Sequence, residues 1–295
     1  MMSFSYEIKE KLGKIMPDCP FCRGAELYGL LRFAGQRRRD GFYFASEHEA
    51  TIDAFCSAVS EELGFLAEPC GKSKNGIFLY RITDPNALDQ LKERFMLRED
   101  GRMENPEEIM PFSCCRESYL RGAFLGGGSI SDPQKSYHME FDANEEAVAA
   151  ELLEVLEELE VHAKTTVRKG HVVVYIKGYE EIAAVLGAIG AGSAAMEIFN
   201  ISIEKEIRNG INRQLNCENA NMDKIVKAYG KHFMAIEKIK NSTGLEVLPE
   251  KLREIAELRM EYPDESLKEL GERLGIGKSG VNHRLNRLIE ISESL

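Results

Sequence analysis

Two pairs of cysteines have a spacing that could bind a metal ion. Cys19 and Cys22 form a C-x-x-C pattern, and Cys114 and Cys115 follow at offsets of 95 and 93 residues. C-x-x-C is one half of a common tetrahedral zinc site. Cysteine is also among the most buried residue types, and adjacent cysteines suit a tetrahedral site poorly. We therefore interpret all four as buried small side chains and assign no metal or cofactor, while the question of metal binding stays open.

The segment 278–289 carries the side chains expected of a helix that reads DNA. Its apolar residues recur at helical spacing, and it contains no acidic residue. Arginine can bridge a guanine edge, asparagine can pair with adenine, and a serine near a helix start can hold a phosphate. The predicted DNA-binding residues of the outer face are Lys278, Ser279, Asn282, His283, Arg284 and Arg287. The alternative is a protein-binding module with a basic face.

Two further groups of polar residues stand nearer the amino terminus. Arg37, Arg38 and Arg39 are consecutive, so they are candidates for phosphate contact, although a solvated turn before Asp40 is the alternative. In the segment 137–142, His138, Glu140 and Asp142 are spaced by two and would share one face of a strand. Acidic groups repel a phosphate backbone, so we expect this strand to be a solvent-facing edge without a metal.

Two glycine-containing helices are expected to position these groups. The segments 27–35, LYGLLRFAG, and 120–128, LRGAFLGGG, both have a glycine at the third position and small residues at the end. Gly29 and Gly122 would let the two helix backbones approach closely, with the cysteine pairs together at the amino ends. The terminal glycines would supply the positive φ that stops a helix.

The segments that follow the two motifs repeat at offsets of 93 to 96 residues, which indicates a duplication. After a leading helix over 3–14, the first copy is predicted as strand 41–46, helix 49–63, strands 66–70 and 77–82, and helix 85–95. The second copy is predicted as strand 137–142, helix 145–159, strands 161–167 and 172–176, and helix 180–189.

The last fifty residues have the pattern of a helix-turn-helix. We expect helices over 252–260, 266–274 and 278–289, with Ser266 as the amino-terminal cap of the second. Gly271, Gly275 and Val281 fit the small crossing residue, the turn and the apolar anchor of this motif.

Between the duplicated segments and the helix-turn-helix, the asparagine-rich part of 204–240 is predicted to be a connection, followed by a basic helix capped by Asn221. That helix is predicted to bury Ile225, Val226, Tyr229, Phe233 and Ile236.

These motifs resemble a known family. The two helices and their α-β-β-α-β-β-α repeats resemble the LAGLIDADG homing-endonuclease fold. The sequence of the second copy, CCRESYLRGAFLGGGSISDPQKSYHMEF, is similar to that of the WhiA family of bacterial sporulation and cell-division regulators. The resemblance implies two half-sheets curved into a saddle that can sit on duplex DNA. In an active homing endonuclease each helix delivers a carboxylate that holds divalent ions. The matching positions here are Ala34 and Gly127, so the resemblance implies that nuclease activity is lost.

Composition excludes a generally basic coat protein for nucleic acid and a membrane protein. The chain of 295 residues has a net charge of −11, which still permits local basic patches. Its seven cysteines indicate a reducing cytoplasm, and no signal peptide or apolar run long enough to span a bilayer is apparent. We expect a cytoplasmic, nucleoid-associated protein.

The sequence therefore predicts an α+β domain over 1–203, with repeats at about 20–98 and 114–203. A basic helical linker over 204–244 and an all-α helix-turn-helix domain over 245–295 follow. We expect a non-enzymatic, sequence-specific transcription regulator that binds promoter DNA, as a monomer or in another oligomeric state, with a possible protein partner in transcription. By the resemblance, it would act in cell division, chromosome segregation and sporulation. The alternatives are an active metal-dependent endonuclease and a protein-interaction module that uses the saddle for a protein partner.

Overall fold

The computed structural model describes residues 3–74, 76–95 and 106–295, so residues 96–98 of the first expected repeat lie outside the description. Its contacts divide the chain into two compact units, Met1–Lys205 and Glu206–Leu295. No helix among the described residues is long and apolar enough to cross a membrane.

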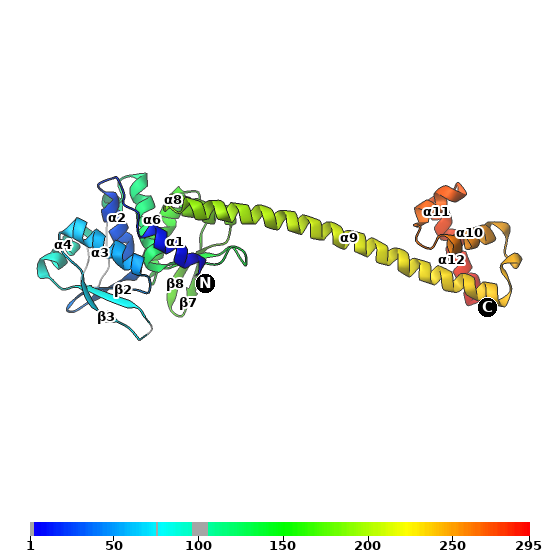
Figure 1. The fold of residues 1–295 in the computed structure, drawn as a ribbon, viewed down its shortest axis with the longest axis horizontal. Coiled ribbons are helices and arrows are strands. Elements are labelled where there is room, and N and C mark those ends of the chain that lie inside the picture. The colour runs from blue at the N-terminus through cyan, green and yellow to red at the C-terminus, as the bar shows by residue number, and fades with distance from the viewer. Residues whose placement is uncertain (1–2, 75, 96–105) are drawn as a thin grey trace. The chain divides into compact units, whose positions relative to one another are not determined.

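The first unit is built around two helices that lie side by side, α2 (Cys22–Ala34) and α6 (Ser113–Gly127) (Figure 1). A Cβ at Gly29 would overlap the Tyr119 carbonyl oxygen, and a Cβ at Gly122 would overlap the Glu26 carbonyl oxygen. Any side chain at either position would push the helices apart. The predicted glycine seam is confirmed.

The glycines at the ends of these helices act differently from the prediction. Gly35 and Gly128 have φ of −81° and −82°, so neither supplies a left-handed stop. Each helix instead runs directly into an extended strand, and a Cβ at Gly35 or Gly128 would overlap Phe42 or Phe124. Close packing, and not positive φ, accounts for the two glycines.

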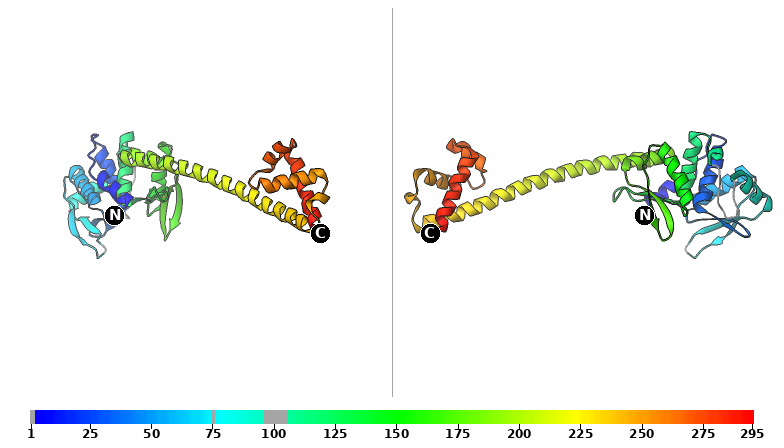
Figure 2. Two further views of the ribbon diagram at one scale, coloured as in Figure 1. Left: turned by 45° about the vertical axis from the view of Figure 1, so that its right-hand side comes forward. Right: turned by 180° about the vertical axis from the view of Figure 1, so that it is seen from behind.

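Each motif helix leads into a four-stranded antiparallel sheet, and the two sheets have the same topology. The first contains β1 (Gly35–Arg38), β2 (Gly41–Ser46), β3 (Glu68–Lys72) and β4 (Phe78–Ile82) in the order β1-β2-β4-β3. The second contains β5 (Gly128–Ile130), β6 (Met139–Asp142), β7 (Lys164–Arg168) and β8 (His171–Ile176) in the order β5-β6-β8-β7. Figures 1 and 2 show both sheets extending to the same side of α2 and α6, as a saddle requires.

Six further helices lie wholly within the described residues of this unit, and all but one lie close to their predicted bounds. They are α1 (Phe4–Leu12), α3 (Glu49–Leu63), α4 (Pro85–Phe95), α5 (Pro106–Ile109), α7 (Glu146–Glu158) and α8 (Tyr179–Ala188). The short helix α5 was not predicted. The prediction that a strand starts at Leu66 is wrong, because β3 begins two residues later and the Leu66 side chain is 78% exposed.

Buried charges connect the two repeats beside the glycine seam. Glu26 of α2 is completely buried and pairs with Arg121 of α6 at 3.3 Å and with Arg23 at 3.1 Å. Burial raises the pKa of Glu26, and the two guanidinium groups oppose that shift. Glu151 of α7 accepts hydrogen bonds from Tyr28 at 2.8 Å and Arg32 at 3.0 Å. The sequence did not predict the pairs that join the two repeats, because their members lie about a hundred residues apart.

The second unit has its own apolar core. It contains most of α9 (Gly192–Ser242), η1 (Leu245–Val247), α10 (Glu250–Glu261), α11 (Leu267–Leu274) and α12 (Lys278–Glu293). Ile236 and Ile239 of α9 pack with Ile255, Leu270 and residues of α12. The carboxy-terminal part of α9 is therefore integral to the core of this unit.

The long helix α9 corrects two predictions. The asparagine-rich part of 204–240 is helical rather than an irregular connection, and Asn221 lies inside the helix instead of capping it. Helix propensity is a weak prior, and apolar residues spaced by four continue through this stretch at 203, 207, 211 and 215. The expected apolar face is also partly wrong, because Val226 and Phe233 are exposed while Ile236 is buried.

Candidate nucleic-acid interface

The amino-terminal half of the helix-turn-helix is fixed by local signals. Ser266 and Glu269 form a reciprocal capping box at the start of α11, which confirms the predicted cap. Gly275 follows α11 with a φ of 65°, the left-handed conformation that glycine adopts without strain. The chain thus leaves α11 sharply and reaches the start of α12 within three residues.

Gly271 is the small residue at the crossing, as predicted. A Cβ at this position would lie 2.6 Å from the Ile276 carbonyl oxygen and 3.4 Å from Cγ2 of Val281. The inner face of α12 is then held by Val281, Leu285 and Leu288, all of which are buried. These contacts set which side of α12 faces solvent.

The outer face of α12 exposes most of the predicted DNA-binding residues. Lys278, Ser279, Asn282, His283 and Arg287 are all exposed. Arg287 lies 2.6 Å from Glu290, one turn further along the helix, and both side chains are about 60% exposed. An exposed ion pair of this kind contributes about 0–1 kcal/mol, so the guanidinium is free to exchange its partner for another acceptor.

Arg284 departs from the prediction that it belongs to the outer face. Its side chain is only 19% exposed and lies 3.7 Å from the Glu254 carboxylate of α10. The physical reason is its helical position, three residues after Val281 and four before Leu288, which turns it toward the inner face. Its orientation favours a role in joining α12 to α10.

Three lysines gather near the start of α12, and the sequence interpretation missed one of them. A pocket in the second unit is lined by Lys224 of α9, Lys268 of α11 and Lys278 of α12, together with Ser266. Lys268 lies outside the third helix, and its position in the first turn of α11 is the sequence signal that could have identified it. Glu265 also lines this pocket and Lys268 lies 3.7 Å from Glu272, so the positive field of the three lysines is partly neutralised.

The three consecutive arginines of the first unit do not share one surface. Arg38 lies on the sheet face with Tyr43 and Arg81, and its guanidinium is 4.4 Å from the Tyr43 ring centroid. Arg37 lines a different pocket with Phe42 and with Glu145 of the second repeat. Alternation along β1 separates them, and Arg39 is exposed at the following turn. The three arginines therefore do not form one basic cluster, and Arg38 and Arg39 remain the candidates for phosphate contact.

The equivalent face of the second sheet is more acidic. His138 and Glu140 lie on one face as predicted, with ring Nε2 and carboxylate 3.2 Å apart. Arg168 approaches Glu140 at 3.3 Å, and His171 approaches Asp142 at 3.2 Å. The predicted edge position is wrong, because β6 pairs with both β5 and β8.

The ends of the motif helices carry no carboxylates. Helix α2 ends at Ala34 and α6 at Gly127, the two positions where a homing endonuclease would place its acids. Asp40 instead accepts a hydrogen bond from the Tyr43 hydroxyl at 2.7 Å, which lowers the pKa of this carboxyl. Asp132 caps its own turn by accepting from the Gln134 amide at 2.9 Å. Both of these candidate replacements are thus engaged locally.

Comparison with known proteins finds relatives that are similar to this chain in sequence and in structure. Family models described as the WhiA LAGLIDADG-like domain and the WhiA C-terminal HTH domain match residues 116–208 and 211–292. A probable cell division protein WhiA of Heliobacterium modesticaldum is 39% identical over 308 residues, covering 99% of this chain and 97% of the relative. The crystal structure of full-length WhiA from Thermatoga maritima has a TM-score of 0.63 and 27% identity, covering 100% of this chain and 99% of that one. The amino-terminal LAGLIDADG domain of a WhiA protein has a TM-score of 0.51 at 22% identity, covering 64% of this chain and 94% of that one.

Proposed function

Because this chain belongs to the WhiA family, we propose that it is a DNA-binding transcription regulator without nuclease activity. The relatives are named probable cell division proteins, which supports a role in cell division. The proposal extends this role, by the family resemblance alone, to gene control in chromosome segregation and sporulation. In this proposal the protein acts on promoter DNA in the cytoplasm, associated with the nucleoid.

The observation that carries the proposal is the outer face of α12. Asn282 and Arg287 are both exposed and, at about 100° per residue, lie roughly 140° apart around the helix axis. They flank the solvent-facing side of α12, whereas Val281 and Leu285 are buried on its inner side. A helix of this kind enters the major groove, where asparagine pairs with adenine and arginine bridges guanine. Ser279 and Lys278, at the amino end, would contact a phosphate of the groove wall.

The basic groups outside α12 would add affinity without adding sequence information. Lys224 and Lys268 lie beside the start of α12, and Arg38 and Arg39 lie on and next to the first sheet face. Phosphate contacts position a protein on a duplex but do not distinguish bases. Base reading is therefore assigned to α12 and phosphate binding to these side chains.

The absence of nuclease activity is supported by the helix ends. A two-metal mechanism needs carboxylates where the attacking and leaving oxygens lie. Ala34 and Gly127 cannot bind a metal, and Asp40 and Asp132 are used in local turns. The amino-terminal unit thus keeps the shape of the nuclease fold without its reactive groups.

The test is a selection of bound duplexes from a randomised DNA library by the full chain, followed by titration of the enriched sequence. The expected result is binding of that duplex at least about a thousandfold tighter than a scrambled one, with a steep decrease as salt rises. The bound DNA is then incubated with magnesium and run on a denaturing gel, where intact strands are expected. Cleavage would overturn the non-enzymatic proposal, and equal binding of enriched and scrambled duplexes would overturn sequence recognition.

A further inference from the structure

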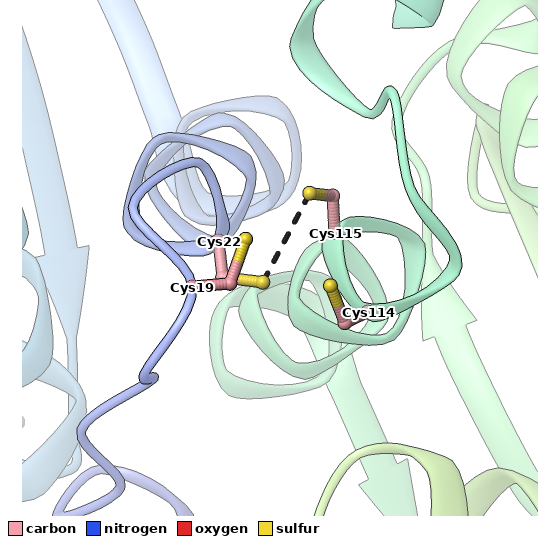
Figure 3. Close-up of side chains that lie close together, drawn as sticks. All are labelled: Cys19, Cys22, Cys114 and Cys115. Atoms are coloured by element: carbon pink, nitrogen blue, oxygen red, sulfur yellow. Dashed lines mark hydrogen bonds between the residues drawn. The ribbon is translucent and has the colours of Figure 1, made fainter.

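The amino ends of the two motif helices bring four cysteines together. Cys19 and Cys22 come from the first repeat, and Cys114 and Cys115 come from the second (Figure 3). Their four sulfur atoms all lie within 4.8 Å of one another, and Sγ of Cys22 is 3.9 Å from Sγ of Cys115. The expected convergence of the cysteine pairs is confirmed, and all seven cysteines of the chain are free thiols in this structure.

The first pair is presented by a tight turn. The Cys22 amide donates a hydrogen bond to the Cys19 carbonyl oxygen at 3.1 Å, and Pro20 occupies the second position of the turn, where proline is favoured. The backbone amide of Phe21 hydrogen-bonds the Cys19 sulfur. This turn directs both sulfurs to one side, and backbone amides point at the Cys19 sulfur. Such a turn is well suited to hold thiolates.

The second pair lies in the first turn of α6. Adjacent residues on a helix point about 100° apart, which was the argument against a shared site. Here α2 lies alongside α6, and Cys114 and Cys115 point to either side of Cys22. Both of their sulfurs therefore lie close to the Cys22 sulfur (Figure 3). The geometric objection that the sequence raised is therefore removed.

The sulfur separations match a single tetrahedral ion. With Zn–S bonds of about 2.3 Å, tetrahedral geometry places sulfurs roughly 3.8 Å apart. The Cys22–Cys115 separation of 3.9 Å already has this value, and the other pairs need to close by less than about 1 Å. An iron–sulfur cluster distributes its thiolates over several irons and would hold these sulfurs further apart.

The surroundings also suit a closed, structural site. The Phe21 and Phe112 rings, which precede the two helix starts, contact each other with centroids 5.7 Å apart. Two helix amino termini point toward the sulfurs and favour negative charge there. Among the described residues this cysteine group is the one cluster of three or more potential ligands that could hold a metal.

We propose that Cys19, Cys22, Cys114 and Cys115 bind one Zn²⁺ ion that links the two repeats at the amino ends of α2 and α6. Four thiolates leave no open position for a substrate, so the ion is structural. Binding releases the thiol protons to solvent and changes no oxidation state. Because each repeat supplies two ligands, the ion would resist separation of the glycine seam.

The experiment measures metal in the full chain purified with a reducing agent and without chelators. The expected content is about one zinc per chain. Replacing the metal with Co²⁺ is expected to give the intense visible bands and near-ultraviolet sulfur-to-metal absorption of a tetrahedral thiolate site. Chelation is expected to lower the melting temperature by several degrees, since the ion contributes to folding.

Two double variants separate this site from the other cysteines. Cys19→Ser/Cys114→Ser removes one half-buried ligand from each repeat and is expected to reduce zinc retention at least about tenfold against a competing chelator. Cys70→Ser/Cys217→Ser changes two exposed cysteines elsewhere and is expected to keep the metal. Far-ultraviolet circular dichroism and the melting temperature show that each variant is folded.

Three results would overturn the zinc site. One is reduced wild-type protein that binds neither Zn²⁺ nor Co²⁺, and another is a cobalt spectrum that persists in Cys19→Ser/Cys114→Ser. The third is protein that contains iron and inorganic sulfide in place of zinc.

Discussion

Both units place a glycine where two segments touch, but the contacts leave different surfaces behind. In the amino-terminal unit, Gly29 and Gly122 bring α2 and α6 together so closely that nearly every residue of α2 is buried. In the carboxy-terminal unit, Gly271 lets α11 pack on the turn before α12, and α12 buries only a narrow face. The nuclease-like seam therefore buries its helices as a scaffold, whereas the second contact leaves most of α12 at least partly exposed.

The largest expected effect is at the seam. Gly122→Ala would place a Cβ against the Glu26 carbonyl oxygen, and neither helix backbone can move without separating the repeats. We expect a loss of about 3 kcal/mol in the free energy of unfolding, the upper end of the usual cost of overpacking. Denaturant unfolding followed by circular dichroism measures it. Gly187→Ala in α8 meets no atom within 4 Å and is the control, expected to be neutral or stabilising.

The next effect is at the crossing of the helix-turn-helix. Gly271→Ala would force its Cβ to within 2.6 Å of the Ile276 carbonyl oxygen, so the turn must shift. We expect about 2 kcal/mol of destabilisation and a matching loss of DNA affinity. Gly280→Ala meets only the Ile276 side chain, at 3.6 Å or more, and should leave the unfolding free energy unchanged or higher. Equal unfolding curves for the two variants would contradict the packing assigned to Gly271.

The two arginines of α12 are expected to differ. Arg287→Ala should weaken binding to the selected duplex by about 1–3 kcal/mol, because a bidentate base contact is lost. Arg284→Ala should cost under about 1 kcal/mol of affinity, since its guanidinium faces Glu254 of α10. Fluorescence anisotropy titrations of both variants measure the difference. A larger loss for Arg284→Ala would place that residue back on the reading face.

The smallest effect is on the sheets of the first unit. Arg38→Ala should weaken binding to enriched and scrambled duplexes alike and reduce the salt dependence by about one phosphate contact. Arg168→Ala, on the second sheet, should change the salt dependence less, because its guanidinium lies 3.3 Å from Glu140. Titrations at several salt concentrations distinguish the two, and identical slopes in both variants and the wild type would remove the first sheet from the interface.

The parts of the fold that local chemistry dictates could be predicted from the sequence. Ser266 and Gly275 mark the ends of α11 by capping and positive φ, and Gly122 marks a close approach. Non-local features could not be predicted. The Glu26–Arg121 pair joins residues 95 positions apart, and the Arg284–Glu254 pair joins two different helices, α12 and α10.

The unbroken length of α9 was also not predicted from the sequence. The asparagines of 204–240 suggested an interruption, yet α9 continues from Gly192 to Ser242. Each asparagine costs a helix only about 0.7 kcal/mol relative to alanine, and such costs are readily overcome. For the candidate site, the residue types of α12 and the inward spacing of Arg284 were visible in the sequence, but the partner of Arg284, Glu254 of α10, was not.

The most direct test of the division between scaffold and reader compares two variants of the full chain on the enriched and scrambled duplexes. Asn282→Ala/Arg287→Ala alters α12, and Arg38→Ala/Arg39→Ala alters the first sheet and its turn. The account predicts that the α12 variant reduces the ratio of specific to non-specific affinity at least about tenfold, whereas the sheet variant weakens both affinities and keeps the ratio. A ratio that collapses in the sheet variant and persists in the α12 variant would show that the saddle reads the sequence.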